Sequence, residues 1–206
     1  MTNARSLDGD ASPAQVQLTP KSFYLLYRNW LAPESARALA AAARDGLDWQ
    51  QRHIVLFGRK ILQPRLVAWA GEVPYRYSGQ TLEPRKVPSF VRDLLAAAGA
   101  AAACSFNHVL MNRYRDENDA MGMHSDDEAE LGPRPSVASL SLGAERRLMI
   151  VSKRRSLGVR HELLLEHNSL LVMGGAFQHE LRHGVPRERR ARAERLNFTF
   201  RRVVVK

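Results

Sequence analysis

His124 and Asp126, two residues apart, are the first side chains whose types and spacing predict chemistry. In an extended strand, residues i and i+2 point to the same face, so the imidazole and the carboxylate would converge on one point. With one distant histidine they would supply three facial ligands and leave three positions of an octahedral metal ion open. The pair alone is weak support, because a solvated loop explains this spacing equally well.

The C-terminal segment alternates strictly between polar and apolar residues. Four polar side chains would share one face of a strand: Arg195, Asn197, Thr199 and Arg201. The three apolar residues between them would share the other face, which predicts a core face. Two guanidiniums, an amide and a hydroxyl form a donor array suited to a dicarboxylate. A solvated outer face is the alternative, but it gives no reason for an asparagine and a threonine between the arginines.

The overall charge and the cysteine usage narrow the functional classes. The 206 residues carry 31 Lys+Arg against 21 Asp+Glu, a formal net charge of +10, and 26 of the basic residues are arginines. This surplus favours a polyanionic partner such as nucleic acid, although the codon bias of a GC-rich genome is an alternative explanation. The single cysteine, Cys104, excludes an intramolecular disulfide and a cysteine-based zinc site.

The chain is expected to be cytoplasmic, and nucleoid-associated if it is bacterial. It has no apolar run of about eighteen residues, the length that a membrane span requires. Its first residues lack the apolar region of a secretory signal.

The elements that must position these side chains follow from periodicity and from turn residues. Residues 1–20 show no periodicity and are expected to form a flexible tail. Helices are predicted from Pro33 to Gly46 and from Pro88 to Gly99, separated by a strand-like region at 51–79. From Ser105 onward the period changes to two, which predicts strands at 106–114, 136–142, 148–152, 162–165, 170–173 and 196–205. The expected architecture is a helical N-terminal layer on a β-sandwich or barrel.

The order of the motifs resembles the AlkB family of alkylated-base dioxygenases. The similarity covers roughly residues 57–202, and its best stretches are 112–114, 124–128, 139–143, 183–186 and 195–201. The resemblance implies an α+β fold with a double-stranded β-helix, or jelly-roll, core. It also implies a single domain over 21–206, in which 21–104 hold the helices and the nucleotide-recognition region and 105–206 the catalytic core.

The resemblance implies Fe(II) as the metal, with His124, Asp126 and His183 as its catalytic ligands. His179, four residues earlier, is a rival for the third position. His183 is preferred because the Gly-Val-Pro that follows it resembles the family pattern, whereas His179 lacks such a context.

The resemblance also implies 2-oxoglutarate as a co-substrate, together with O2. Six residues are expected to bind it: Asn112, Tyr114, Arg195, Asn197, Thr199 and Arg201. Arg195 would pair with its far carboxylate, while Asn197 and Arg201 would support the carboxylate nearer the iron. A dianion that enters a low-dielectric cavity needs paired positive charge, which supports this assignment on physical grounds.

The implied reaction is oxidative demethylation of an N-alkylated base in DNA, of the 1-methyladenine or 3-methylcytosine type. It converts 2-oxoglutarate and O2 to succinate and CO2 and releases the methyl group as formaldehyde. The protein would position the reactants and exclude water, while the metal and co-substrate carry the oxidising power.

Acidic and aromatic residues are expected to contact the damaged base. Glu128 and Asp127 would accept a hydrogen bond from its exocyclic amino group, unless they form an exposed acidic turn. Tyr77 is the first choice and Tyr75 the second for stacking on a flipped base, unless both pack in the N-terminal core.

The segment around Leu56, Phe57 and Arg59 is expected to contact the duplex. An apolar tip between basic flanks resembles the hydrophobic finger of double-strand-preferring relatives, which wedges into DNA while its charges hold phosphates. A buried β-hairpin is the alternative for these residues.

Two other hypotheses remain open at the level of sequence. One keeps the oxygenase chemistry but changes the substrate to RNA, a protein or a small molecule. The other is a non-enzymatic nucleic-acid-binding module, against which the intact ligand set and both arginines argue. The sequence does not predict the oligomeric state, although a jelly roll of this size can act as a monomer.

Overall fold

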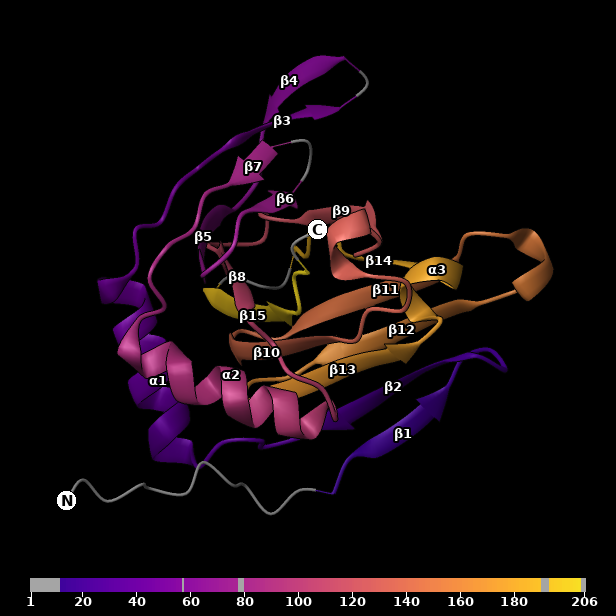
Figure 1. The fold of residues 1–206 in the computed structure, drawn as a ribbon, viewed down its shortest axis with the longest axis horizontal. Helices are drawn as coiled ribbons and strands as arrows, with labels where there is room; N and C mark the ends of the chain where they lie inside the picture. The colour runs from indigo at the N-terminus through magenta and orange to yellow at the C-terminus, as the bar shows by residue number, and fades with distance from the viewer. Residues whose placement is uncertain (1–11, 57, 78–79, 190–192, 205–206) are drawn as a thin grey trace.

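The computed structural model describes residues 12–56, 58–77, 80–189 and 193–204, with the backbone alone for Val55, Leu56 and Tyr77. Two antiparallel β-sheets face each other, and two long helices cover the outer face of the larger one (Figure 1). This arrangement confirms the expected jelly-roll core with added helices. Within the described residues, no helix is long and apolar enough to cross a membrane.

The strand order places the C-terminal strand inside the larger sheet, with a paired strand on each side. That sheet runs β1 (Ala14–Gln17), β2 (Ser22–Tyr27), β13 (Ser169–Gly175), β10 (Val137–Gly143), β15 (Arg195–Arg201), β8 (His108–Tyr114) and β5 (Leu66–Gly71). The smaller sheet runs β12 (Arg160–Leu165), β11 (Arg146–Ser152), β14 (Leu181–Val185) and β9 (Met121–His124). Every strand predicted after residue 105 is present, with ends shifted by a few residues.

The helices begin where the proline residues predict. Helix α1 (Pro33–Gly46) has its proline in the first turn, and α2 (Ser89–Ala101) follows Pro88, which is its N-cap residue. In α1 the buried residues are Ala36, Leu39 and Ala43, whose helical spacing places them on one face against the larger sheet. A third, short helix, α3 (Phe177–Glu180), connects β13 to β14.

Two hairpins project beyond the sheets on one side of the molecule (Figure 1). The first is β3 (His53–Leu56) with β4 (Arg59–Leu62), and the second is β6 (Tyr75–Tyr77) with β7 (Gln80–Leu82). They correspond to the strand-like region that was predicted at 51–79.

Strand β15 separates two interiors. Its three apolar residues join the core under the helices, and its four polar residues face the space between the sheets. All seven residues are buried, and Arg195 and Arg201 are each only 1% exposed. The predicted division of faces is confirmed, and the alternative of a solvated polar face is wrong.

The expected tail is shorter than predicted. Ala14–Gln17 form strand β1, which pairs with β2, so the prediction of an unstructured segment to residue 20 is wrong for these residues. Of these four residues only Val16 packs against the core, and the strand pairs with β2 along its whole length. Residues 1–11 lie outside the described part of the chain.

Two glycines offer a test of the fold. Both have left-handed backbones, with φ of +69° at Gly175 and +63° at Gly158. A Cβ at Gly175 would lie 2.2 Å from the Lys21 carbonyl oxygen, whereas nothing lies within 4 Å of one at Gly158. We expect Gly158→Ala to lower the free energy of unfolding by about 1–2 kcal/mol, and Gly175→Ala by clearly more. Urea denaturation measures both, and equal losses would contradict the close approach at Gly175.

Candidate functional site

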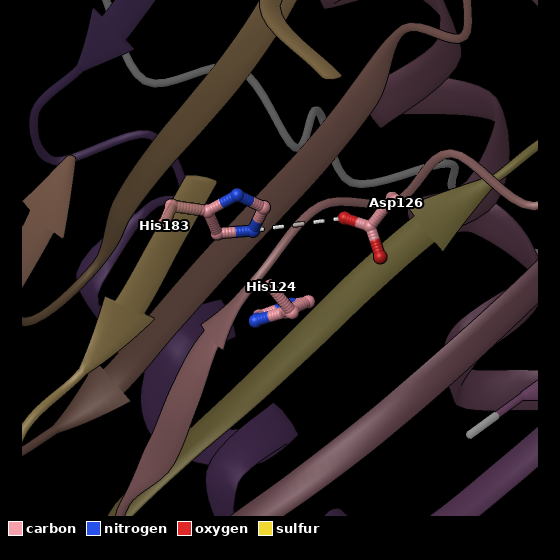
Figure 2. Close-up of side chains that lie close together, drawn as sticks. All are labelled: His124, Asp126 and His183. Atoms are coloured by element: carbon pink, nitrogen blue, oxygen red, sulfur yellow. Dashed lines mark ion pairs between the residues drawn. The ribbon is translucent and has the colours of Figure 1, made fainter. Parts of the chain in front are cut away.

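Three side chains converge in the space between the sheets (Figure 2): those of His124, Asp126 and His183. Each offers one ligand atom, and the three atoms lie within 4.8 Å of one another. His124 is the last residue of β9 and pairs with His183 on β14. No other group of three such ligands occurs among the described residues. The predicted convergence is confirmed.

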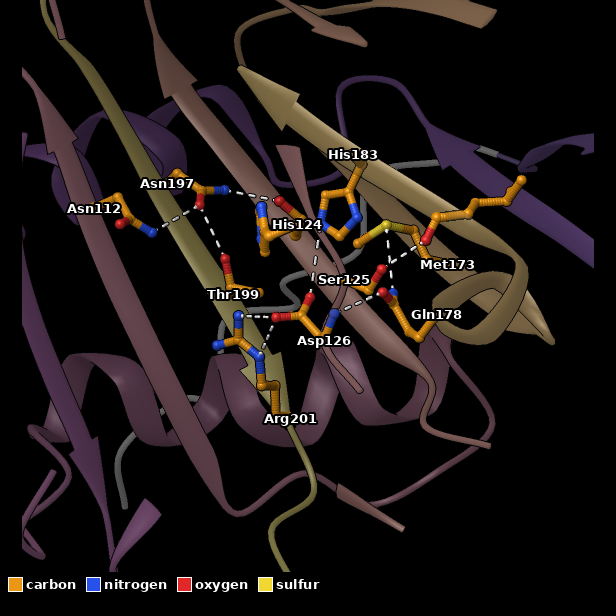
Figure 3. A network of polar contacts seen from close by, with 12 residues as sticks. Asn112, His124, Ser125, Asp126, Met173, Gln178, His183, Asn197, Thr199 and Arg201 are labelled. Atoms are coloured by element: carbon orange, nitrogen blue, oxygen red, sulfur yellow. Dashed lines mark hydrogen bonds and ion pairs between the residues drawn. The ribbon is translucent and has the colours of Figure 1, made fainter. Parts of the chain in front are cut away.

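The local reason for the convergence differs from the prediction. Strand β9 ends at His124, so Asp126 lies in the following loop rather than on the same strand face. The loop is held instead by hydrogen bonds (Figure 3): the Asp126 backbone N–H donates to Gln178 Oε1 at 3.0 Å, and Ser125 Oγ donates to the Leu181 carbonyl at 2.8 Å.

The Asp126 carboxylate is oriented by a buried ion pair. Arg201 donates to Oδ1 through Nη2 at 2.6 Å and through Nε at 3.1 Å, and both side chains are at most 2% exposed. Oδ2 has no hydrogen-bond partner among the described residues and lies 3.6 Å from His183 Nε2. Burial acts to raise the pKa of Asp126, but Arg201 and the two histidines hold it at about 2. The carboxylate is therefore ionised, with one oxygen available to a metal.

Both imidazoles are neutral. Burial lowers the pKa of His124, and burial together with His124 lowers the pKa of His183 to about 3. The Nδ1–H of His124 donates to the Gly122 carbonyl at 2.9 Å, which leaves Nε2 as the ligand atom. Two neutral imidazoles and one carboxylate fit Fe(II), which takes this facial set in non-haem oxygenases.

Arg195 supplies positive charge to the same cavity. Its side chain is buried, and Nη2 donates to Ser141 Oγ at 2.9 Å. Its Nε and Nη1 have no hydrogen-bond partner within the described part of the chain, and the guanidinium lies 5.0 Å from the centre of the Tyr114 ring. A buried cation with unsatisfied donors fits an anionic ligand, as the dicarboxylate assignment requires.

The cavity wall carries an ordered set of amides and hydroxyls (Figure 3). Asn197 Oδ1 accepts from Asn112 Nδ2 at 3.3 Å and from Thr199 Oγ1 at 2.9 Å. Asn197 Nδ2 donates to Ser139 Oγ at 2.8 Å and to the Leu140 carbonyl at 3.0 Å. The structure thus brings together all six residues predicted for the co-substrate, although Arg201 contacts Asp126 directly.

The residues predicted for the base divide into two groups. Glu128 is partly buried; burial and Asp126 raise its pKa, against the lowering effects of Arg201 and of a hydrogen bond with Tyr75. Asp127 is exposed and its carboxylate accepts from Lys153 Nζ at 2.7 Å, so it is paired with the base of the β11–β12 hairpin.

Tyr75 does not offer a stacking face. Its side chain is fully buried and meets the ring of His108 edge-on at 4.9 Å, in a cluster with Trp69 and Leu82. The second choice for stacking on a flipped base is therefore wrong, and packing in the N-terminal core is the correct alternative for Tyr75.

The predicted finger lies on the projecting β3–β4 hairpin. Arg59 is exposed there, and the nearby Ile61 and Leu62 are exposed by 41% and 44%. The residue Phe57 and the side chains of Leu56 and Tyr77 lie outside the described residues, so their roles stay predictions.

Several supporting residues escape sequence reasoning. Gln178 and Arg65 act through contacts that span more than forty residues, which no local pattern reveals. Ser139 and Ser141 were detectable, because they alternate along β10 directly opposite Thr199 and Asn197 of β15.

Comparisons with known proteins agree with this geometry. Residues 23–201 match the family model described as the 2OG-Fe(II) oxygenase superfamily. The chain is 35% identical over 201 residues to alpha-ketoglutarate-dependent dioxygenase alkB homolog 3 of Homo sapiens, which covers 92% of this chain and 70% of that protein. It is 34% identical over 162 residues to DNA oxidative demethylase ALKBH2 of Homo sapiens, covering 74% and 61%.

The fold is also found among solved structures. A structure described as OsALKBH1 superposes with a TM-score of 0.64 at 18% identity, covering 92% of this chain and all of that one. At this identity the likeness supports the fold alone.

The two histidines that competed for the third ligand position provide a matched test. His179 is exposed and its Nε2 contacts the Pro133 carbonyl, away from the ligand group. We expect His183→Ala to weaken Mn(II) or anaerobic Fe(II) binding by more than about a hundredfold, since even loss of a residue that merely orients a ligand costs ten- to hundredfold. His179→Ala should bind as the unmodified protein does. Calorimetric titration measures both, and weakened binding in His179→Ala alone would reverse the assignment.

Proposed function

Because the chain belongs to the AlkB-like branch of the 2OG-Fe(II) oxygenase superfamily, we propose that it is a dioxygenase that demethylates N-alkylated bases in DNA. Its substrates would be bases of the 1-methyladenine and 3-methylcytosine type. The proposal draws on the relatives' names, which include a DNA oxidative demethylase, and on the residues of the site.

One observation carries the proposal. The metal-ligand group and the buried, incompletely satisfied Arg195 line the same cavity between the sheets. A metal site alone is compatible with many reactions, and a buried arginine alone with structural roles. Their combination fits a metal ion and a dicarboxylate held side by side, which is the requirement for this oxygenase chemistry.

When bound, Fe(II), 2-oxoglutarate and O2 supply the oxidising power: one oxygen atom enters succinate and the other hydroxylates the methyl carbon. The protein's residues orient and shield these groups. Arg201 directs Asp126 Oδ2 toward the metal position, and Arg195 receives the far carboxylate together with Ser141. The hydroxymethyl group on nitrogen would then lose its C–N bond: the electron pair returns to the base nitrogen, the hydroxyl proton goes to solvent, and formaldehyde leaves.

Glu128 is proposed to select the damaged base. A methylated adenine or cytosine of this type carries positive charge, whereas its neutral parent does not. A partly buried carboxylate accepts from the exocyclic amino group and favours the charged form. Arg59, exposed on the projecting hairpin, is proposed to contact phosphate, in keeping with the basic surplus of the chain.

The direct test is turnover. With Fe(II), 2-oxoglutarate and O2, we expect single-stranded or duplex DNA carrying 1-methyladenine or 3-methylcytosine to release formaldehyde and succinate in equal amounts. Methylated RNA and unmodified DNA serve as comparisons at fixed salt, because phosphate contacts make affinity salt-dependent. If only methylated RNA releases formaldehyde, the substrate is RNA and not DNA. If no oligonucleotide releases formaldehyde, the proposal of demethylation is refuted.

A second prediction concerns Glu128. The change Glu128→Gln keeps the size of the side chain but removes its charge, so we expect the KM for a methylated oligonucleotide to rise by about ten- to hundredfold. Glu130→Gln, in the same loop, is the control and should change KM little. Steady-state formaldehyde assays measure both, and an unchanged KM in Glu128→Gln would remove this residue from base recognition.

A further inference from the structure

Arg65 is a buried arginine that neither the sequence motifs nor the proposed reaction uses. It lies between the β3–β4 hairpin and strand β5, and it is 5% exposed. Its Nε donates to Asn112 Oδ1 at 2.8 Å, and its Nη1 donates to the Ala120 carbonyl at 3.1 Å. It therefore contacts one of the residues assigned to the co-substrate, Asn112.

The contact with Asn112 matters because an asparagine amide has two ends of nearly equal size and opposite polarity. Its oxygen only accepts hydrogen bonds, and its nitrogen only donates. A carboxylate of 2-oxoglutarate needs the donor, so an amide turned the wrong way would present an acceptor to an anion. A guanidinium has five donors and no acceptor, so Oδ1 is the only end of Asn112 that can pair with Arg65.

The second hydrogen bond of the Asn112 amide, made by Nδ2, is consistent with this orientation. With Oδ1 on Arg65, Nδ2 points to Asn197 Oδ1, which also accepts from Thr199 (Figure 3). Asn112 and Asn197 are directly paired across β8 and β15. The donors therefore run in one direction, from Arg65 through Asn112 to Asn197. The Arg65 contact is the shorter and the charge-assisted one, and such bonds are about twice as strong as neutral ones.

Arg65 is itself held in place. The Ala120 N–H donates to the Pro64 carbonyl at 2.8 Å, so the backbone beside Arg65 is tied to the segment whose carbonyl the guanidinium contacts. Ala120 directly precedes β9, the strand that ends in His124. The donor to Asn112 is thus fixed relative to both the co-substrate wall and the metal-bearing strand.

We propose that Arg65 is a positioning residue for 2-oxoglutarate: by holding Asn112 Oδ1, it keeps the Asn112 Nδ2 donor on Asn197, whose side chain lines the co-substrate cavity. This inference rests on the proposed function, because it takes 2-oxoglutarate to be the occupant of that cavity. In this proposal Arg65 acts only through Asn112 and does not contact the reacting atoms.

The test is a double-mutant cycle on co-substrate binding. Binding of 2-oxoglutarate to the Mn(II)-loaded protein is measured by calorimetric titration, so that no turnover is needed. Arg65→Met removes the donors and leaves Asn112 Oδ1 buried without this partner, for which we expect the Kd of 2-oxoglutarate to rise by about five- to hundredfold. Asn112→Ala should raise it by a similar factor. Because Arg65 acts through Asn112, adding Arg65→Met to Asn112→Ala should raise the Kd no further.

Matched controls separate positioning from a general loss of structure. Arg37→Met, at an exposed arginine on α1, should leave the Kd unchanged, and each titration is run at saturating Mn(II), so that a change in metal affinity does not enter the comparison. If thermal unfolding shows that Arg65→Met does not fold, Arg65→Lys enters the same cycle with a smaller expected rise. Independent, multiplicative effects of the two changes would overturn the inference, as would an unchanged Kd in the folded Arg65 variant. Failure of the unmodified protein to bind 2-oxoglutarate would instead overturn the proposed function.

Discussion

The site depends on one buried ion pair, between Arg201 on β15 and Asp126 in the loop after β9. Removing a carboxylate from water is costly, and a single guanidinium offsets this cost only with good geometry and further partners. Here two N–H groups bind one oxygen, while the backbone N–H of Asp126 is held by Gln178. The second oxygen is left for a metal. The pair thus converts a loop residue into a fixed ligand without the strand that such spacing normally needs.

The elements that could be predicted from sequence are those with a local period, namely the two long helices and the strand at the C-terminus. Strict alternation from Arg195 to Arg201 defined both the core face and the donor face, because the strand period is two. What could not be predicted depends on tertiary packing. Arg65 and Gln178 reach their partners across the fold, and β1 exists only through β2. Tyr75 resembled a stacking residue, but it is buried at the start of the β6–β7 hairpin, in a cluster with Trp69 and Leu82.

The charge of the chain divides between two environments. Three arginines are buried around the cavity. Arg65 donates to the Asn112 amide, Arg195 donates to Ser141, and Arg201 donates to the Asp126 carboxylate. Arg59 lies exposed on the projecting hairpin, where a polyanion can reach it. A net charge of +10 is therefore a poor measure of affinity for nucleic acid, since part of it belongs to the interior.

The position of β15 has a consequence for how the protein is made. This is the last of the described strands along the chain, yet it lies between β10 and β8, inside the larger sheet. During synthesis the sheet therefore stays divided until β15 emerges, and the edges of β10 and β8 stay open to wrong partners. Arg201 arrives with this strand, so the metal ligands cannot reach their final arrangement earlier. The ligand group is therefore complete only after β15 has paired with both of its neighbours.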